Sequence, residues 1–340
     1  MFDLKNMEKT TVLNRISFRQ MEYFVSTAQH GSIIVASEKI HVSPPSISAA
    51  ISHIESELKV KLFIRQHARG LSLTSIGEKI LKECLFILGQ TYSLYALASE
   101  YRGLTQRALH IGCHHVLTPL IYSDIVHDFN LLHQDEDIRL VDGHHDELMN
   151  ALLSNKVDMV ITTNLQIDHN LICFEPIVNL PPQILVSEDH PLAKLKHVTL
   201  KDLTQFSMIL HDSPHYKDYC TELFRQHNLV PNLKETYKNY DLVRTMVADG
   251  LGYSMTNLRY KLEHTLNGKK LIRLMLEGDH TPLSIGIATI SNVNLNEVAE
   301  KFMGYCKSFI CDYYQANEHT SSSFGLTSSI EKTRSIARVA

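Results

Sequence analysis

The chain has 340 residues, 44% of them hydrophobic, and a formal net charge of -4 at pH 7. This length exceeds one small domain and suits a small domain followed by one or two α/β lobes. The acidic balance argues against a protein that is basic throughout, although residues 1–80 carry a mild excess of lysine and arginine. No apolar run is long enough to span a membrane and no signal peptide is found, so we expect a cytoplasmic protein.

Two helices with capping signals open the chain after a polar leader. Ser17 and Gln20 form a capping box, which predicts a helix from Phe18 to about His30. Its inward residues follow helical spacing: Phe18, Met21, Phe24, Val25 and Ala28. Ser32 precedes a second apolar run, and its hydroxyl is expected to cap a helix over about 33–40.

A third helix follows after a short break. We expect the Ser43 hydroxyl to cap it, and Pro44 and Pro45 to occupy its first positions, where an amide needs no intrahelical acceptor. One apolar stripe faces inward: Ile47, Ala50, Ile51, Ile54 and Leu58. The opposite face carries small or polar side chains: Ser46, Ser48, Ala49, Ser52 and His53. Such a face lets a helix backbone approach DNA closely in the major groove.

Taken alone, this helix pair also fits a solvated helical hairpin that has no role in DNA binding. The segments that follow favour the DNA-binding interpretation. Residues 61–65 and 71–74 are predicted to be two short strands that flank the loop 66–70 with its basic residues. The predicted arrangement is a three-helix head with a basic wing.

The segment from Ile16 to Glu78 resembles the winged helix-turn-helix of the LysR-type transcriptional regulators. The matching stretches are, in order, FRQMEYFVSTAQHGS, ASEKIHVSPPSISAAISHIESEL, KLFIR and LSLTSIGE. Two positions depart from the family pattern. Pro44 stands where glutamine is usual, and Ala49 stands where a longer polar or basic side chain is frequent. These departures concern which bases are read rather than how the head docks.

The resemblance implies a regulator that binds an inverted-repeat operator in double-stranded DNA. Phosphate contacts are expected from the basic residues of the head and wing, and base contacts from the exposed face of the third helix. The expected DNA-contacting residues are Arg19, Ser32, Ser43, Pro44, Pro45, Ser46, Ser48, Ala49, Ser52, His53, Lys61, Arg65 and Arg69. RNA polymerase is a further expected partner.

Thr74 is expected to cap a long helix that extends to about Arg102. Residues spaced by four and three along it predict the seam of a two-stranded coiled coil: Leu81, Leu85, Leu88, Tyr92, Tyr95 and Ser99. The alternative is a helix that packs on its own lobe. The resemblance to the family's dimeric linker helix favours the coiled coil, and with it a homodimer or homotetramer.

From residue 108 onward the pattern alternates between strands and helices, which predicts an α/β architecture. The first lobe is expected to be a parallel βαβαβ unit with these elements: strands 108–113, 138–142 and 159–162, and helices 119–133 and 147–154. The second lobe is expected to contain strands 184–186, 207–210 and 234–237, and helices 217–227 and 241–249. The strand 284–289 and the helix 296–314 are expected to return the chain to the first lobe. Two such lobes resemble the family's effector domain, which is like a type II periplasmic binding protein.

We therefore predict a multi-domain chain, with an all-α winged helix-turn-helix head and linker helix followed by a two-lobed α/β domain. The expected bounds are a leader 1–14, a head 15–73, a linker helix 74–103, an effector-binding domain 107–315 and a mostly disordered tail 316–340. Within the effector-binding domain, lobe I covers about 107–164 and 281–315, and lobe II covers about 165–280.

Ligands of open α/β sheets bind at the carboxyl ends of strands, where helix N-termini offer unpaired amides. The residues expected there are Cys113, His114, His115, Val116, Thr162, Thr163, Asn164, His211, Asp212, Ser213, Tyr240, Asp241 and Tyr253. They favour a small polar metabolite as effector. Because no basic residue stands out among them, hydroxyls, amides or a protonated histidine would have to bind any carboxylate.

Other sensing chemistries stay open on the same scaffold. The histidine pairs 114–115 and 144–145 allow a metal effector, and Cys173 with Cys220 allows a thiol switch. Adjacent histidines point in different directions, and no Cys-x-x-Cys pair occurs among the six cysteines, so no resident metal is predicted.

Enzyme motifs are absent from the sequence. Gly250-x-Gly252 lacks the third glycine of a dinucleotide fingerprint, and no hydrolase, Walker or metalloprotease motif occurs. We therefore predict no enzyme activity and no cofactor. The weakest alternative is a small-molecule-binding protein or enzyme that retains a head domain.

Overall fold

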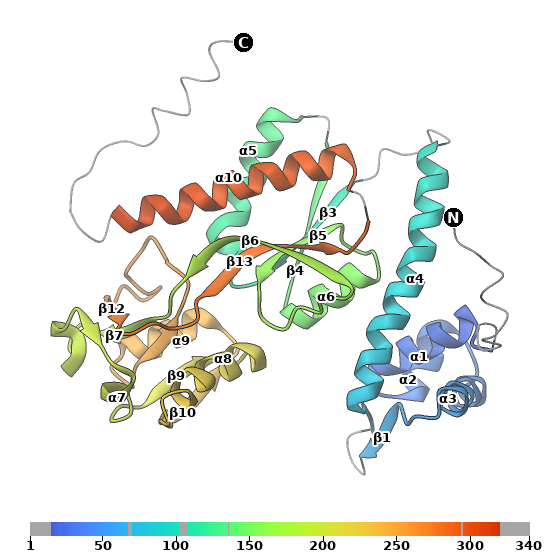
Figure 1. Cartoon of the computed structure of the whole chain (residues 1–340), viewed down its shortest axis with the longest axis horizontal. Helices are drawn as coiled ribbons and strands as arrows, with labels where there is room; N and C mark the ends of the chain where they lie inside the picture. Colours follow the sequence, from blue (N-terminus) through green and yellow to red (C-terminus); the bar gives the residue numbers. More distant parts are fainter. Residues whose placement is uncertain (1–14, 67–69, 102–107, 135, 294, 320–340) are drawn as a thin grey trace.

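The structure is a computed structural model that describes residues 15–66, 70–101, 108–134, 136–293 and 295–319. It contains a helical head, a long helix and two α/β lobes, which follow one another from right to left in Figure 1. The predicted fold class is confirmed. The expected leader 1–14, Arg69, Arg102 and the tail from residue 320 onward lie outside the described residues.

The head is built from three helices and a hairpin: α1 (Phe18–His30), α2 (Ile33–Ile40), α3 (Pro44–Leu58), β1 (Phe63–Gln66) and β2 (Gly70–Leu73). The capping box of Ser17 and Gln20 is present, and the Ser32 hydroxyl accepts a hydrogen bond from the amide of Val35 at 3.4 Å. Capping and apolar spacing are local properties, and the helix bounds therefore follow the prediction closely.

Three details of the head correct the prediction. Phe18 is 55% exposed and Leu58 is 39% exposed, because each lies at the end of its helix rather than in the packed middle turns. The Ser43 hydroxyl caps no amide and instead lies 2.7 Å from the Ser46 hydroxyl. Pro44 and Pro45 have no amide hydrogen. The first amide of the helix that needs an acceptor belongs to Ser46, and it donates to the Ser43 carbonyl at 3.0 Å.

Lobe I contains a five-stranded sheet in the order β4-β3-β5-β13-β6. Its strands are β3 (Leu109–His114), β4 (Ile138–Gly143), β5 (Met159–Thr163), β6 (Ile172–Leu180) and β13 (Leu283–Ile290). As predicted, β3 is parallel to both β4 and β5, whereas β13 is antiparallel to its neighbours β5 and β6. The carboxyl ends of β3, β4 and β5 therefore lie along one edge of the sheet.

Helices cover both faces of this sheet (Figure 1). They are α5 (Ser123–Leu132) and α10 (Glu297–His319) on one face and α6 (His145–Leu153) on the other. Successive side chains of β5 pack on opposite faces of the sheet. Met159 and Ile161 belong to the core under α5 and α10, whereas Val160 packs with α6. Lobe I is therefore a three-layer unit with two apolar cores.

Four features of lobe I differ from the prediction. The helix expected from residue 119 begins as a π-helical turn, Thr118–Tyr122, so Thr118 lies inside it and caps nothing. The Thr118 hydroxyl donates to the Asp142 carboxylate at 2.6 Å instead. The strand β6 was missed, since it lies at the edge of the sheet, contains Pro176 and has no regular alternation. The chain therefore stays in lobe I until Leu180, beyond the expected boundary at 164, and α10 ends five residues later than predicted.

Lobe II contains a four-stranded sheet in the order β11-β7-β12-β8 and a parallel pair, β9 and β10. Its elements are β7 (Gln183–Ser187), a 3-10 helix (Pro191–Lys194), β8 (His197–Val198), α7 (Leu200–Leu203), β9 (Met208–His211), α8 (Pro214–Arg225), β10 (Leu233–Tyr237), α9 (Tyr240–Ala248), β11 (Ser254–Thr256) and β12 (Leu271–Leu276). The sequence did not predict β8, α7 or β12. Tyr253 lies fully buried in the core of this lobe, so it does not reach the cleft where it was expected.

The long helix α4 (Ser75–Tyr101) begins at its predicted cap, where the Thr74 hydroxyl accepts from the Gly77 amide at 2.9 Å. Its packing differs from the predicted seam. Leu85 and Leu88 are buried in one cluster with α6 side chains, whereas Tyr92 is 64% exposed. The first half of the seam is therefore used within the chain, as the alternative of packing on its own lobe describes.

The backbone of α4 packs closely against the end of α6 in lobe I. A Cβ atom at Gly89 would overlap the backbone carbonyl oxygen of Leu153, at the end of α6. One turn further along α4, the Ser93 hydroxyl accepts a hydrogen bond from the side-chain amide of Asn155. This contact joins the helix that carries the head to the lobe that carries half of the cleft.

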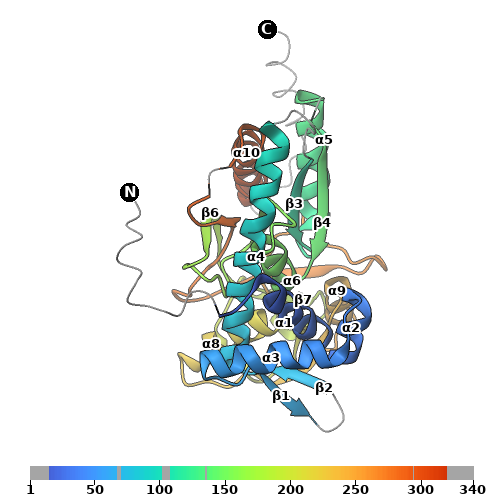
Figure 2. The ribbon, with the colours of Figure 1, turned by 90° about the vertical axis from the view of Figure 1, so that its right-hand side faces the viewer.

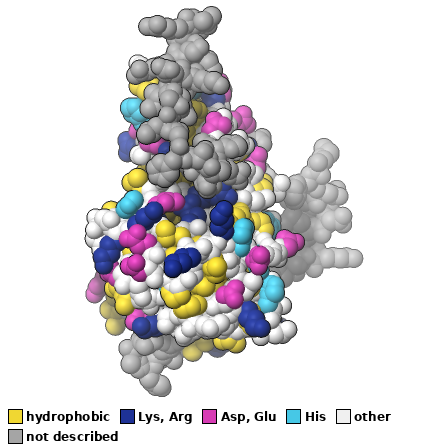
Figure 3. Space-filling model, turned by 90° about the vertical axis from the view of Figure 1, so that its left-hand side faces the viewer, with side chains coloured by type: hydrophobic (Ala, Val, Ile, Leu, Met, Phe, Trp, Pro, Cys, Tyr) yellow, Lys and Arg dark blue, Asp and Glu magenta, His cyan; other side chains and the backbone are white. Residues whose placement is uncertain are grey.

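The outer face of lobe II has a mixed surface. Figure 3 shows basic and acidic side chains interspersed over it, with small apolar areas between them. This face therefore lacks the concentrated positive charge that contact with DNA phosphates favours. Within the described residues, no helix is both long enough and apolar enough to cross a membrane.

Candidate functional site

The outward face of α3 presents the residues that were expected to contact DNA. The predicted residues of this face are exposed: Ser43, Pro44, Pro45, Ser46, Ser48, Ala49, Ser52 and His53. The stripe that faces inward has Ile47, Ala50, Ile51 and Ile54 buried. Figure 2 shows α3 and the hairpin of β1 and β2 at the same end of the head. A helix with small side chains and a hairpin are thus available to one DNA duplex.

One polar contact orients a side chain on this face. The Gln20 amide nitrogen lies 3.2 Å from His53 Nδ1, and the Gln20 oxygen accepts from the Ser17 amide at 2.8 Å. The first helix of the head therefore positions an imidazole of the third. Ser32 acts as a helix cap at its own position, so its hydroxyl is already engaged.

The basic residues of the head have different surroundings. Arg19 is exposed, and Lys61 is 79% exposed at its side chain while its Nζ lies 2.6 Å from the Glu55 carboxylate. Partial burial raises the pKa of Glu55, but the bonds from Lys61 and from the Leu62 amide outweigh it and leave the pKa below its ordinary value. Glu55 therefore stays ionised and holds α3 against the start of the wing. Arg65 lies in β1, and Arg69 is outside the described residues.

A pocket lies between the two lobes, at the carboxyl ends of the strands, as predicted for an α/β sheet. The space among its side chains, with its opening to solvent included, is about 560 Å³. We call it the inner pocket. Six of the predicted residues line it: His114, Val116, Thr163, His211, Ser213 and Tyr240.

Other lining residues of the inner pocket were not predicted. They include His145, Leu165, His215, Tyr216, Thr256 and Asn257, together with Leu258 and Leu283. Most belong to the start of a helix or to the segments where the chain crosses between lobes, whereas the predicted set took residues at or shortly after the ends of strands. The second histidine of the 144–145 pair was a signal in the sequence, but it was assigned to a metal alternative instead.

A second, wider opening adjoins the inner pocket and shares Val116 and Tyr240 with it. We call it the outer pocket. His115 and Asp241, both predicted, line it. Three carboxylates and one lysine lie on its wall: Asp142, Glu147, Asp241 and Lys238. The outer pocket therefore has an excess of negative charge.

Five predicted effector residues do not reach either pocket. Cys113 is buried in the core under α5 and α10, and burial raises the pKa of its thiol to about 12. Thr162 is buried on the α6 side, 3.3 Å from His145 Nδ1. Asn164 accepts from the Ser284 amide at 3.0 Å, and Asp212 is exposed. The fifth residue, Tyr253, is buried in the core of lobe II. Alternate residues of a strand point to opposite faces, so strand-end position alone does not select the cleft.

Histidines from both lobes meet in the cleft. The His115 and His211 Nε2 atoms lie 3.3 Å apart, and the His115 and His144 ring centroids are 4.3 Å apart. His215 of lobe II lies 2.9 Å from the Asp146 carboxylate of lobe I. These contacts join β9 and α8 to the ends of β3 and the start of α6.

Burial lowers the pKa of the imidazoles of His114, His115, His145 and His211 and so favours their neutral form at pH 7. It lowers the pKa of His114 to about 3, with a further contribution from the neighbouring histidines, and that of His115 to about 4. Burial also lowers the pKa of His145 and of His211. Despite their number, no three His, Cys, Asp or Glu side chains in the described part of the chain are placed to hold a metal ion.

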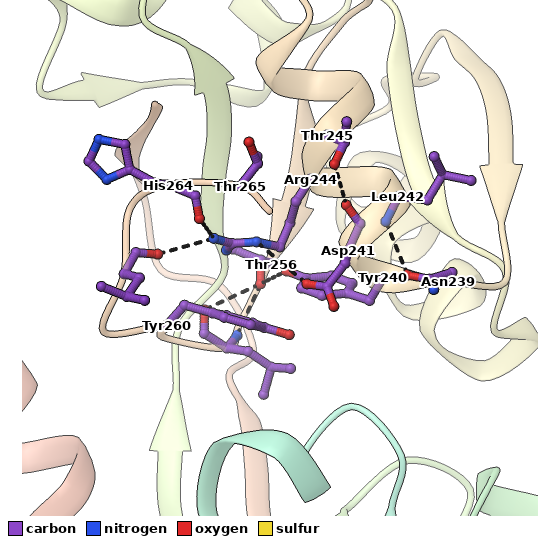
Figure 4. A network of polar contacts seen from close by, with 12 residues as sticks. Asn239, Tyr240, Asp241, Leu242, Arg244, Thr245, Thr256, Tyr260, His264 and Thr265 are labelled. Carbon is purple, nitrogen blue, oxygen red and sulfur yellow. Dashed lines mark hydrogen bonds and ion pairs between the residues drawn. The ribbon is translucent and has the colours of Figure 1, made fainter. Parts of the chain in front are cut away.

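The Tyr240 hydroxyl donates to the Thr256 hydroxyl at 2.6 Å, and its ring stacks on that of Tyr260 with centroids 5.6 Å apart. Figure 4 shows Arg244 beside this stack. The guanidinium carbon of Arg244 lies 4.1 Å from the centroid of the Tyr260 ring. Its Nη2 atom donates to the carbonyl oxygens of Leu262 and His264, each at 3.1 Å. Arg244 thus fastens the loop after β11 to α9 and supports the floor of the cleft.

Asn257 ties the crossing segments together. Its amide nitrogen donates to the Leu180 carbonyl at 2.8 Å and lies 3.0 Å from the Tyr219 hydroxyl, while its oxygen accepts from the Tyr216 hydroxyl at 3.1 Å. The Tyr219 hydroxyl in turn donates to the Thr281 carbonyl at 2.8 Å. A ligand that touches Tyr216 or Asn257 therefore lies next to the hinge between the lobes.

Comparison with known proteins agrees with this geometry. Residues 18–78 match the family model described as bacterial regulatory helix-turn-helix protein, lysR family, and residues 102–310 match that of the LysR substrate binding domain. Together the two models span the head and the two lobes.

Individual relatives and solved structures match most of the length of this chain. The HTH-type transcriptional regulator CfxR of Cupriavidus necator is 26% identical over 259 residues, which is 76% of this chain and 79% of that protein. The regulator CysB of Haemophilus influenzae is 24% identical over 300 residues, 85% of this chain and 90% of that protein. The crystal structure of HinK, a LysR family transcriptional regulator from Pseudomonas aeruginosa, superposes with a TM-score of 0.58 at 29% identity and covers 86% of this chain and 98% of that one. The chain belongs to the LysR family of transcriptional regulators.

Proposed function

We propose that this regulator binds an inverted-repeat operator through α3 and its wing, and that a small molecule in the cleft between the lobes controls how it bends that DNA. The observation that carries the first part is the exposed face of α3 beside the hairpin (Figure 2). Side chains as small as Ser46 and Ala49 let the helix approach the base edges. They offer few long donors, so recognition relies strongly on the shape of the DNA.

A palindromic operator requires at least two heads, and α4 supplies a surface for a second copy. Apolar side chains remain exposed along it, with Ile87 at 37%, Tyr92 at 64% and Leu94 at 67%. Tyr92 belongs to the second half of the predicted seam, whereas Leu85 and Leu88 of its first half are already used by α6. Burial of exposed apolar side chains of α4 against a partner helix would support a dimer or tetramer.

The second part rests on the path between pocket and head. The inner pocket lies next to the hinge at Asn257. The first residue of α6, His145, lines the pocket, and the other end of α6 packs against α4 at Gly89. A ligand that favours one closure of the lobes therefore acts on the helix that carries the head. We propose that the protein acts by this binding equilibrium and not by catalysis.

The test is selection from random double-stranded DNA, followed by DNase I footprinting of the selected site. We expect a protected site with dyad symmetry and an affinity that falls steeply between about 50 and 200 mM salt. Ala49→Glu brings a carboxylate to the groove face and is expected to abolish protection. Asn130→Glu adds the same charge at an exposed position of α5 and serves as the control. A site without symmetry, or equal binding by the two variants, contradicts the proposal.

A further inference from the structure

The inner pocket has no fixed charge on its wall. Among the described residues that line it there is no lysine, arginine, aspartate or glutamate. Its apolar surface comes from Val116, Leu165, Leu258 and Leu283, and its aromatic surface includes Tyr216. Burial disfavours the charged form of the His114 imidazole, so this group contributes no positive charge at neutral pH. His215, also on the wall, is already bonded to the Asp146 carboxylate at 2.9 Å. A charged group that entered this space would lose its water without gaining an unpaired counter-ion.

The arginines near the cleft, Arg244, Arg259 and Arg273, do not line the inner pocket and so do not supply that counter-ion. Arg244 Nη2 donates to the carbonyls of Leu262 and His264, and its guanidinium lies over the Tyr260 ring (Figure 4). Arg273 Nη2 donates to the Tyr260 carbonyl at 3.1 Å. Both guanidinium groups therefore hold the loop after β11 and do not line the inner pocket.

The charge of the outer pocket, which adjoins the inner pocket, also disfavours the binding of anions. The outer pocket carries Asp142, Glu147 and Asp241 against a single lysine, Lys238. An anion on its way to the inner pocket meets an excess of negative charge, which lowers its local concentration.

A few polar atoms remain for a ligand. Tyr240 and Thr256 are bonded to each other, and Tyr216 is bonded to Asn257. In contrast, the Nδ1 atom of His114, whose residue is only 9% exposed, has no hydrogen-bond partner in the described structure. A buried polar atom without a partner is costly, and a bound molecule that supplies a partner recovers that cost.

We propose that the inner pocket binds an uncharged small molecule with an apolar or aromatic body and one or two hydrogen-bonding atoms, and that it excludes carboxylates. This inference rests on the proposed function, since it names the chemical class of the effector. It narrows the expected polar metabolite to a neutral one that pairs with His114. It needs no metal ion and no ionised histidine.

The charge of the pocket is measurable without a ligand. In the full-length protein labelled with 13C at histidine Cε1, the signals of His114, His145 and His211 are assigned by substitution of each with glutamine. We expect His114 to remain neutral between pH 8 and pH 6, and His145 and His211 to be predominantly neutral at pH 7. An imidazolium signal from any of them at pH 7 overturns the proposal, because the pocket then holds a cation that fits a carboxylate.

Three probes with the same ring test the ligand class by calorimetric titration at pH 7.5: benzamide, benzoate and benzylammonium. We expect benzamide to bind at least tenfold more tightly than the other two. Benzoate or benzylammonium at equal or higher affinity overturns the proposal, and so does the absence of a preference. Ser213→Arg places a cation at the pocket wall and is expected to reverse the order of benzamide and benzoate, whereas Thr221→Arg, exposed on α8, is expected to leave it unchanged.

The operator footprint on the same protein samples separates the two proposals. Dyad protection with a preference for benzoate contradicts the ligand class alone. Neutral histidines and a preference for benzamide without any footprint contradict the proposed function alone.

Discussion

The Nε2 atoms of His115 and His211 face each other across the cleft at a distance of 3.3 Å. His211 Nε2 also lies 2.9 Å from the Lys238 carbonyl oxygen, which can only accept, so this nitrogen carries the proton. His115 Nε2 must then face it with a lone pair and share this one proton with the Lys238 carbonyl. The two lobes are thus held by a contact that only a neutral His115 can make, in agreement with its pKa of about 4.

Substitution of His115 by leucine should therefore loosen the closed arrangement of the lobes. A neutral hydrogen bond contributes about 1 kcal/mol, which corresponds to an approximately fivefold more frequent opening. We expect amide hydrogen exchange to accelerate by this factor over residues 211–213 and 238–240, which lie across the cleft. Exchange that accelerates equally in the head would instead indicate general destabilisation.

Acid should destabilise the protein through His114. Its pKa is about 3 in the folded chain and near 6.5 when unfolded, so below pH 6.5 the unfolded chain binds the extra proton. Stability is then lost as the pH falls from 6.5 toward 3, by about 1.4 kcal/mol per pH unit from this group. Urea unfolding of the native chain and of His114→Gln between pH 6 and pH 4 measures the difference. Identical pH slopes would show that His114 is accessible to protons in the folded state.

The approach of α4 to α6 should be sensitive to a single methyl group. At Gly89 an added Cβ overlaps the Leu153 carbonyl oxygen, so Gly89→Ala is expected to cost about 1–3 kcal/mol in thermal unfolding. Gly304, in α10, has no atom within 4 Å of such a Cβ, so Gly304→Ala is the matched control. There the higher helix propensity of alanine should stabilise the chain by about 0.5–1 kcal/mol. Equal effects of the two substitutions would rule out the close contact.

Glu55→Gln should weaken the junction between α3 and the wing. The carboxylate is 13% exposed and accepts from Lys61 and from the Leu62 amide, so its loss is expected to cost about 1 kcal/mol in urea unfolding at pH 7. Its lowered pKa makes this contribution present above about pH 4.5 and lost as the pH falls through the folded value.

The matched control for that change is Glu57→Gln. Glu57 pairs with Arg15 at 3.3 Å on the surface, where an ion pair contributes less than about 1 kcal/mol. A cost for Glu57→Gln as large as that for Glu55→Gln would show that burial of the Glu55 pair adds nothing.

The head illustrates how much local sequence predicts. Ser17 with Gln20, Ser32 and Thr74 all cap the helices that they were expected to cap. Capping depends on residues three positions apart, and such contacts are visible in the chain itself. The prediction failed at Ser43 because the amide three residues on, that of Ser46, donates to the Ser43 carbonyl, while the Ser43 hydroxyl lies 2.7 Å from the Ser46 hydroxyl.

The cleft illustrates where local sequence is insufficient. The prediction that strand ends gather at one edge placed His114, His211 and Tyr240 correctly in the inner pocket. It also included Cys113 and Thr162, whose side chains point into the two cores of lobe I. Position along a strand does not specify the face, which depends on how helices pack against both sides of the sheet.

By itself, the sequence determined the order of head, linker helix and two lobes, and the exposed face of α3, since these follow from caps, hydrophobic period and motif. Only the tertiary structure decided that His115 meets His211, 96 positions away, and that Gly89 lies on Leu153. It likewise directed Arg244 to backbone carbonyls and left the inner pocket without a lysine, arginine, aspartate or glutamate on its wall, as the described residues show. Contacts between distant residues depend on how the lobes pack, and no local pattern encodes that packing.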